Sequence, residues 1–321
     1  MGREDKVLTI LPNEIRERLV KLLSEEAKLQ EIRLRSGRPL AVIYDNREYF
    51  IDENGNATTN PRQGFVVRHK WIRETMEYVS NYSLYAYEEE MRQGYITIEG
   101  GHRVGLAGKI VMEGEQVTQM KHISFMNIRL SHEMIGCGRQ LCRYIVEKQR
   151  VYNTLLISPP RSGKTTMLRD LVRIFSNGEG LEQGYTVGVV DERSEIAACY
   201  MGVPQNDVGV RTDVLDCCPK SQGMTMLLRS MAPQIIAVDE IGGSRDLEAL
   251  KSAMNCGCSI FATVHGENME EIRTKPILRS FVEMHLFQRY VVLSAGAKLG
   301  QVQHIYDDMG NCIYWGKQET A

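Results

Sequence analysis

The 321-residue sequence lacks any apolar run long enough to cross a bilayer. Its longest hydrophobic stretches, LLI, IIAV and YVVL, have the length of β-strands. A membrane helix needs about 20 apolar residues. The opening stretch MGREDKVLTILPNEIRERL has no extended apolar core either. We therefore expect a cytoplasmic protein that contacts a membrane only through a partner.

Paired metal-binding cysteines are also missing. None of the eight cysteines is spaced as CxxC, which argues against a zinc site and favours small buried thiols in a reducing compartment. The formal net charge is only −2 at pH 7, and no basic segment interleaved with aromatic residues stands out. A nucleic-acid partner is therefore not expected.

What the sequence does contain divides into two parts. Residues 1–145 are predicted to form a smaller mixed α+β domain, with an amphipathic helix at about 12–29 and a hairpin around the DN turn at 45–46. A helix at about 132–149 leads into the second part. Residues 146–321 alternate short apolar strands with helices, which predicts an α/β domain with a central, mostly parallel sheet.

A phosphate-binding loop follows the first strand of the second part, in TLLISPPRSGKTT. In the pattern G-x-x-x-x-G-K-[ST], backbone N–H groups and a helix N-terminus surround the phosphates while the lysine reaches their oxygens. Ser158 replaces the first glycine, at a position where a small side chain suffices. The residues predicted to bind the nucleotide are Ser158, Pro159, Pro160, Arg161, Ser162, Gly163, Lys164, Thr165 and Thr166.

Two later strands end in acids. The strand QIIAV is followed by Asp239 and Glu240. An acid at a strand end beside the loop can hold Mg²⁺, and a second acid can activate the attacking water. We therefore predict that Thr165 and Asp239 hold the metal.

The strand YTVGVV is followed by DERSE. Because ligands of such sheets bind at the carboxyl ends of the strands, Glu192 is the leading candidate for the general base, and Glu240 is the alternative. Arg193 and Glu195 are interpreted as a local surface ion pair.

The strand SIFATVHG ends in Thr263 and His265. A polar residue there reaches the γ-phosphate if its strand lies between the loop strand and the Asp239 strand. We predict that His265 senses whether the γ-phosphate is present.

The order of these motifs resembles that of the type II and type IV secretion ATPases. The stretches SGKTTMLRDLVR, VVDERSE, DEIGG and FATVHG carry the resemblance. Together with EIRLRSGRPL, GYITIEGGHRVGLAGKIV and NIRLSHE, they resemble more narrowly the branch of that superfamily that acts in endospore formation.

This resemblance implies a RecA-like ATPase core that binds ATP and Mg²⁺ and works as a homo-hexamer. The implied partners are membrane proteins of a sporulation channel complex, on the mother-cell side of the forespore membrane. The resemblance also implies that Arg103 of GHRVGLAG and Arg129 of NIRLS meet the γ-phosphate charge. Many secretion ATPases have two histidines around the strand that corresponds to SIFATVHG. The resemblance places Cys258 at the position of the first histidine, so only His265 inherits the role of sensing the γ-phosphate.

The predicted function is thus Mg²⁺-dependent ATP hydrolysis that drives domain motion and powers a channel complex. Two alternatives stay open. One is an assembly scaffold that binds ATP with little turnover. The other is a nucleic-acid-translocating motor with the same core, which requires a basic channel loop with aromatic residues, whereas the segment 200–221 is mixed in charge.

Overall fold

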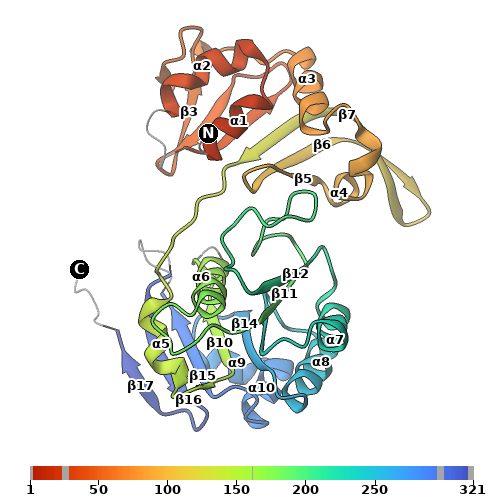
Figure 1. Ribbon diagram of the computed structural model, residues 1–321. Coiled ribbons are helices and arrows are strands. Elements are labelled where there is room, and N and C mark those ends of the chain that lie inside the picture. Colours follow the sequence, from red (N-terminus) through yellow and green to blue (C-terminus); the bar gives the residue numbers. More distant parts are fainter. Residues whose placement is uncertain (1–2, 24–28, 161, 295–299, 317–321) are drawn as a thin grey trace. The chain divides into compact units, whose positions relative to one another are not determined.

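The chain forms two compact units in this computed structural model, which describes residues 3–23, 29–160, 162–294 and 300–316. The first unit comprises Met1–His132 with Ala198–Gln205, and the second comprises Glu133–Ala197 with Asn206–Ala321 (Figure 1). The division at His132 falls earlier in the chain than the predicted boundary at residue 145. A short segment of the second half also belongs to the first unit.

The first unit is built on an antiparallel sheet in the order β4-β3-β2-β1-β7-β6-β5. Its strands are β1 Leu29–Arg35, β2 Ala41–Tyr44, β3 Arg47–Ile51, β4 Ala57–Thr58, β5 Tyr95–Ile98, β6 His102–Glu113 and β7 Gln116–Arg129. Its helices are α1 Arg3–Thr9, α2 Asn13–Leu23, α3 His69–Val79 and α4 Glu88–Gln93, with short 3-10 turns at Pro61–Gln63 and Leu84–Tyr87. Apolar side chains from these helices and from the sheet form one core.

The predicted hairpin is confirmed. Asp45 and Asn46 take positive φ values of 48° and 60°, the combination that a tight two-residue turn between twisted strands requires. The predicted helix at 12–29 is wrong at its end, because α2 ends at Leu23 and Leu29 already begins β1. β1 pairs on both sides, with β2 and β7, and this tertiary pairing overrides the helical pattern.

The second unit is built on a sheet in the order β12-β11-β13-β14-β10-β15-β16-β17. Pairing is parallel from β12 to β15 and antiparallel from there to β17. The strands are β10 Thr154–Ser158, β11 Val187–Asp191, β12 Thr212–Asp216, β13 Ile235–Val238, β14 Ser259–His265, β15 Arg289–Leu293, β16 Val302–Asp307 and β17 Cys312–Trp315. The predicted α/β class with a mostly parallel sheet is confirmed, and β14 lies between β10 and β13.

Helices cover both faces of this sheet (Figure 1). They are α5 Arg139–Ile145, α6 Lys164–Asn177, α7 Lys220–Ser230, α8 Ser244–Asn255, α9 Met269–Thr274 and α10 Pro276–Glu283. Alternate strand residues point to opposite faces, so Leu155 and Ile157 join the core under α7 to α10. On the other face the ring of Phe175 from α6 meets that of Phe261 from β14, with 4.9 Å between centroids.

The predicted helix at 132–149 is mostly absent. Only α5 is helical, and Val146 and Glu147 pair with Arg150–Val151 as the small hairpin β8–β9. Gly136 has a φ of +91°, which a regular helix excludes. The residues before α5 therefore form an irregular segment at 131–134 and a turn at 135–138.

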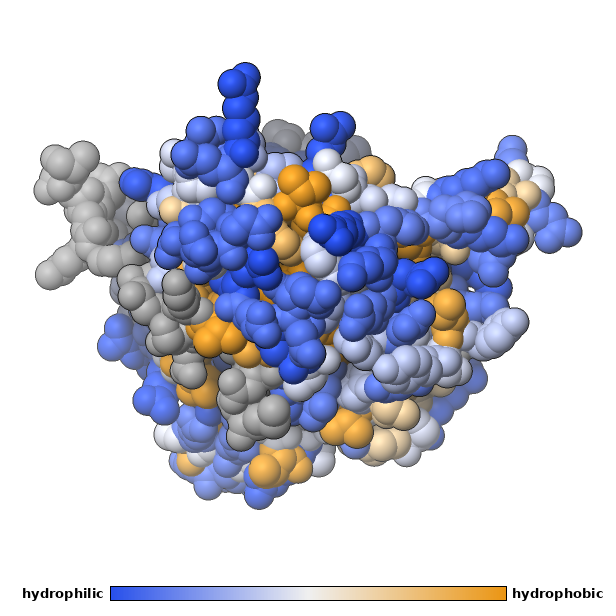
Figure 2. All heavy atoms as spheres, turned by 90° about the horizontal axis from the view of Figure 1, so that it is seen from above, coloured by the Kyte–Doolittle hydropathy of each residue, from blue (hydrophilic) through white to orange (hydrophobic). Residues whose placement is uncertain are grey.

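No helix among the described residues is both long and apolar enough to cross a membrane. The face shown in Figure 2 is mostly hydrophilic, and its hydrophobic groups are scattered among polar ones. The most exposed large apolar side chains of the described residues are those of Tyr85, Val210 and Met201, with exposed fractions of 87%, 81% and 79%.

A buried carboxylate shapes the loop that follows β11. Asp191 is 2% exposed, and its two oxygens accept the backbone N–H groups of Glu195, Ile196 and Ala197 at 2.8 to 2.9 Å. Burial raises the pKa of Asp191 to about 6, although the three N–H donors act in the opposite direction. Asp191 is therefore part of the scaffold that presents its neighbours.

We expect the stability of the second unit to depend on pH, because Asp191 binds protons differently in the folded and unfolded chain. Its pKa is about 6 in the folded chain and about 3.9 when unfolded, so the folded state binds more protons between these values. This contribution to stability is therefore present below about pH 4 and is lost as the pH rises through 6.

Asp191→Asn cannot ionise, so the free energy of unfolding of the wild type relative to this variant should fall by on the order of 2–3 kcal/mol from pH 4 to pH 7. Denaturant titrations at matched pH values measure the difference. The exposed carboxylate of Glu248 on α8 supplies the control, Glu248→Gln. Parallel pH profiles for the wild type and Asp191→Asn would contradict the assignment.

Candidate functional site

The predicted phosphate-binding loop connects β10 to α6. Gly163 caps the helix at a φ of +85°, a conformation that favours glycine. Ser158 is fully buried and donates its hydroxyl to the Pro159 carbonyl at 3.1 Å, so the residue in place of the first glycine is satisfied locally. Ser162 is also buried, and its carbonyl accepts the N–H of Gly300 at 2.9 Å.

The remaining loop residues of the prediction follow the same path. Pro159 and Pro160 lie between the strand and the helix, and Thr166 lies in the first turn of α6. Arg161, which the sequence also assigns to the nucleotide, lies outside the described residues.

The first turn of α6 contacts the end of β13. Thr165 Oγ1 donates to Asp239 Oδ2 at 2.6 Å. The second carboxylate oxygen of Asp239 accepts a hydrogen bond from the Thr263 hydroxyl of β14. Both oxygens of Asp239 are thus held, one by the helix and one by the central strand.

The hydroxyl of Thr165 and the carboxylate of Asp239 are hard oxygen ligands of the kind that Mg²⁺ binds. Mg²⁺ in phosphate-transfer sites usually takes one or two protein oxygens together with substrate phosphates and waters. The pair therefore fits that ion. No group of three or more His, Cys, Asp or Glu side chains that could hold a metal is found in the described part of the chain.

A hydrogen-bonded chain joins the loop lysine to Glu240. Lys164, only 5% exposed, donates to His265 Nδ1 at 3.4 Å, and His265 Nε2 lies 2.9 Å from Glu240 Oε1. A lysine ammonium can only donate and a carboxylate can only accept. These partners assign the proton of neutral His265 to Nε2, so the imidazole connects the phosphate loop to the acid after β13.

Glu240 is held in an unusual backbone conformation. Its φ is +54°, in the left-handed region that costs a non-glycine residue about 1 kcal/mol or more. Its N–H donates to Thr263 Oγ1 at 2.9 Å, which keeps it there. Such conformations concentrate at functional sites, where they orient a side chain.

The acids after β11 and β13 face the same small cavity, which is lined by Asp191, Glu192, Arg193, Glu195, Lys220, Asp239 and Glu240. Lys220, at the start of α7, forms an ion pair with Glu192. Arg193 forms an ion pair with Glu240, with 2.7 Å between NH1 and Oε2. Arg193 therefore reaches across to the neighbouring strand end, and its predicted pair with Glu195 stays a prediction.

The sequence reasoning missed Lys220 and the role of Arg193. Lys220 lies in the segment 200–221, which showed only mixed charge, and it follows β12, a strand that was not predicted. No local pattern marks either residue, because each one's partner comes from a different strand end. By contrast, Lys164, Thr165, Asp239, Glu240 and His265 are brought into one connected set.

The two predicted arginines lie in the first unit. Arg103 of β6 and Arg129 of β7 are directly opposite each other in the sheet. Arg129 Nε lies 3.1 Å from Glu31 Oε1, and the guanidinium of Arg103 stacks 3.6 Å from the ring centroid of Tyr95. Two like charges opposite each other destabilise a strand pair, so the presence of Glu31 beside them is a local compensation.

The comparisons with known proteins agree with this architecture. The family model described as "Sporulation stage III, protein AA" matches residues 1–313. Stage III sporulation protein AA of Bacillus subtilis (strain 168) is 37% identical over 310 residues, which cover 96% of this chain and 97% of that relative.

Two solved ATPase structures are similar in fold. The Legionella pneumophila ATPase DotB has a TM-score of 0.56 at 13% identity, over 88% of this chain and 77% of that chain. The pilus retraction motor PilT, solved with bound ADP, has a TM-score of 0.57 at 15% identity, over 90% of this chain and 80% of that chain. The predicted RecA-like core and the resemblance to secretion ATPases are therefore confirmed, and the chain belongs to the stage III sporulation protein AA family.

Proposed function

We propose that the protein is a Mg²⁺-dependent ATPase. The observation that carries the proposal is the convergence of Lys164, Thr165 and Asp239, with 2.6 Å between the Thr165 hydroxyl and the Asp239 carboxylate, where the phosphate loop meets the end of β13. The lysine binds phosphate oxygens, and the backbone N–H groups of residues 159–164 surround the phosphates. A bound Mg²⁺, held by Thr165 and Asp239, neutralises charge on the β and γ oxygens.

We assign the general base to Glu240. Each glutamate pairs with a cation, Glu240 with Arg193 and Glu192 with Lys220. Glu240 is in addition joined through His265 to the lysine that meets the γ-phosphate. Glu240 accepts the proton of the attacking water, and His265 donates to Glu240 or to the phosphate depending on the nucleotide state. Glu192 and Lys220 then shape the charge of the cavity around the water.

Lys164→Ala should reduce ATP hydrolysis to the buffer background. The loss of one charged donor to the transferring phosphoryl group costs at least about 100-fold in rate. Phosphate release by the purified protein measures the effect, and Lys251→Ala on α8 removes a lysine remote from the loop as the control. Equal rates in the wild type and Lys164→Ala would instead favour an ATP-binding scaffold with little turnover.

Strong stimulation of the wild type by single-stranded DNA would favour a nucleic-acid motor.

Glu240→Gln should lower kcat by about 100- to 1,000-fold, because the isosteric amide cannot accept the proton from water. Nucleotide affinity should stay within about threefold, since the amide keeps the volume of the carboxylate. Glu192→Gln, the matched variant, should lower kcat by less than about tenfold. Single-turnover hydrolysis and calorimetric binding of Mg·ADP separate the two quantities. The reverse order of the two effects would assign the base to Glu192.

We further propose that the active form is a homo-hexamer in which Arg103 and Arg129 meet the γ-phosphate of a neighbouring subunit. The supporting observation is that Arg103 and Arg129 lie opposite each other on β6 and β7, with the side chain of Arg129 54% exposed. An arginine supplied in this way is worth about 10³- to 10⁵-fold in rate.

Mixing two inactive variants tests this arrangement. Lys164→Ala lacks the loop lysine and Arg129→Ala lacks the arginine, so a mixed assembly contains interfaces with both groups intact. Hydrolysis should reappear on mixing, and light scattering should give the mass of the assembly. Continued inactivity of a mixture that assembles would contradict action between subunits.

The family assignment supports a role in sporulation. On this proposal the ATPase acts in the cytoplasm of the mother cell, peripheral to the forespore membrane, and is bound there by membrane proteins of a channel complex. The energy of hydrolysis then drives relative motion of the two units. Such motion requires no second substrate and no covalent product.

A further inference from the structure

The chain passes between the two units three times, after His132, after Ala197 and after Gln205. Three segments of the second unit adjoin these passages, namely 133–138, 195–197 and 206–211. We call them the crossing segments. Each is hydrogen-bonded to α6, the helix that starts at the phosphate loop, or to another crossing segment.

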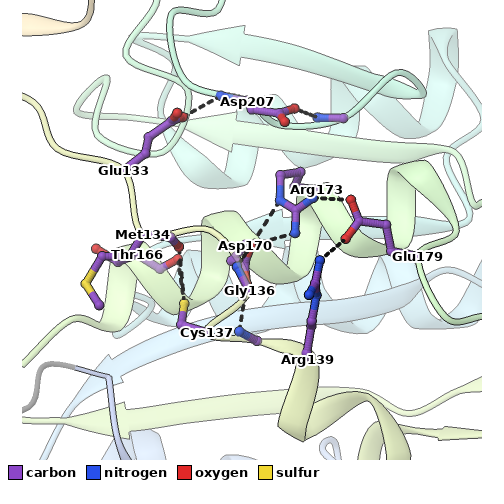
Figure 3. A network of polar contacts seen from close by, with 12 residues as sticks. Glu133, Met134, Gly136, Cys137, Arg139, Thr166, Asp170, Arg173, Glu179 and Asp207 are labelled. Carbon is purple, nitrogen blue, oxygen red and sulfur yellow. Dashed lines mark hydrogen bonds and ion pairs between the residues drawn. The ribbon is translucent and has the colours of Figure 1, made fainter.

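Asp170 of α6 holds the first crossing segment (Figure 3). Its carboxylate accepts the N–H of Gly136 at 3.0 Å and the N–H of Gly138 at 2.7 Å. Asp170 is 2% exposed, and an added side-chain atom at Gly138 would lie 3.3 Å from its Oδ2. Glycine at that position leaves room for the close approach of backbone to carboxylate without a shift of the neighbouring side chains.

Buried charges fix the carboxylate of Asp170. Arg173, one turn later on α6, lies 2.9 Å from Asp170 Oδ1 and also forms an ion pair with Glu179. Arg139, at the start of α5, approaches Glu179 at 3.4 Å (Figure 3). The side chains of Asp170 and Arg173 are 1% and 4% exposed. Such a buried pair contributes little net stability, but it penalises any geometry that separates the charges.

Arg169, the neighbouring residue on α6, holds the second crossing segment. Its guanidinium donates to the Glu195 carbonyl at 2.5 Å and to the Ile196 carbonyl at 2.6 Å. Both acceptors lie in the loop that Asp191 supports and that begins with Glu192. One residue of α6 therefore contacts the loop that carries a site acid, near the point where the chain enters the first unit.

The third crossing segment is tied to the other two. Asn206 donates from its side chain to the Ile196 carbonyl at 3.0 Å and from its N–H to the Ala197 carbonyl at 3.0 Å. The N–H of Asp207 donates to Glu133 Oε1 at 2.6 Å (Figure 3). All three passages are thus joined into one hydrogen-bonded set that is attached to the middle of α6 through Arg169 and Asp170. The third segment is also bonded to the end of α6, where Ser176 and Asn177 accept the N–H groups of Arg211 and Val210.

We infer that Arg169 and Asp170 couple the nucleotide loop to the passages between the units. They lie four to six residues after Lys164 and Thr165, about 6–9 Å along a helix that moves as a rigid rod. A shift of the first turn of α6 on nucleotide binding is therefore delivered to Gly136, Gly138 and the Glu195–Ile196 carbonyls. The inference rests on the proposed binding of nucleotide to the loop.

Hydrogen exchange read by mass spectrometry tests the coupling. In the wild type, Mg·ADP should slow exchange about tenfold in peptides from the loop and also in peptides from the crossing segments. Two variants break the anchors. Asp170→Asn leaves one oxygen for two N–H donors, and Arg169→Met keeps the aliphatic part of the side chain without its donors. The second variant, at a half-buried position, keeps the test available if the buried Asp170→Asn does not fold.

In each variant the affinity for Mg·ADP should stay within about threefold of the wild type, and the loop should still be protected. The nucleotide response should fall below about twofold in the crossing segment that has lost its anchor, which is 133–138 in Asp170→Asn and 195–197 in Arg169→Met. The control Glu182→Gln removes an exposed carboxylate just beyond α6 that accepts a hydrogen bond from Gln149, so it should respond like the wild type.

The possible results separate the two proposals. Absence of Mg·ADP binding by the wild type would overturn the proposed function. Binding by the wild type with protection of the loop alone would overturn the coupling and leave the proposed function standing. Variants that bind Mg·ADP and still show tenfold slower exchange in the crossing segments would also overturn it, because the anchors would then be purely structural.

Discussion

The Thr165 hydroxyl and the Asp239 carboxylate lie 2.6 Å apart although they are 74 positions apart in the chain. This contact joins the first turn of α6 to the end of β13, and it depends on the parallel order of β10, β14 and β13. Because parallel strands end at the same edge of a sheet, the loop after β10 and the acids after β13 share that edge. The chemistry of the site follows from this constraint.

The central strand β14 organises the site and contributes none of its acids. Thr263 bonds to the carboxylate of Asp239 and accepts the N–H of Glu240, and His265 bonds to both Glu240 and Lys164. A strand between the loop and the acids can fix both at once, because its side chains reach either neighbour. This also explains how Glu240 keeps a left-handed φ of +54°.

Helix α6 contacts both the candidate site and the crossing segments. Its first turn meets Asp239, and its middle carries the paired anchors of the connecting chain. The buried carboxylate of Asp170 is matched by charge as well as by hydrogen bonds, because Arg173 pairs with it. The family model spans residues from both units, so the family assignment applies to both.

Local pattern in the sequence determined much of the second unit. The apolar runs that became β10, β11, β13 and β14, the spacing of the phosphate loop and the acids after the strands are all visible without coordinates. They are visible because strand burial and loop chemistry act over a few neighbouring residues. The order of motifs likewise sufficed to indicate the ATPase superfamily.

Only the tertiary structure decided the position of β14, the end of the first long helix, the strand β12 and the pairing of Lys220 with Glu192. Each depends on partners far away in the chain, and a local pattern carries no information about them. The same holds for Asp170, which looks like any charged residue of an amphipathic helix until packing buries it against Gly136 and Gly138. Burial turns an ordinary solvated carboxylate into an anchor, because without water it must take its hydrogen bonds from the chain.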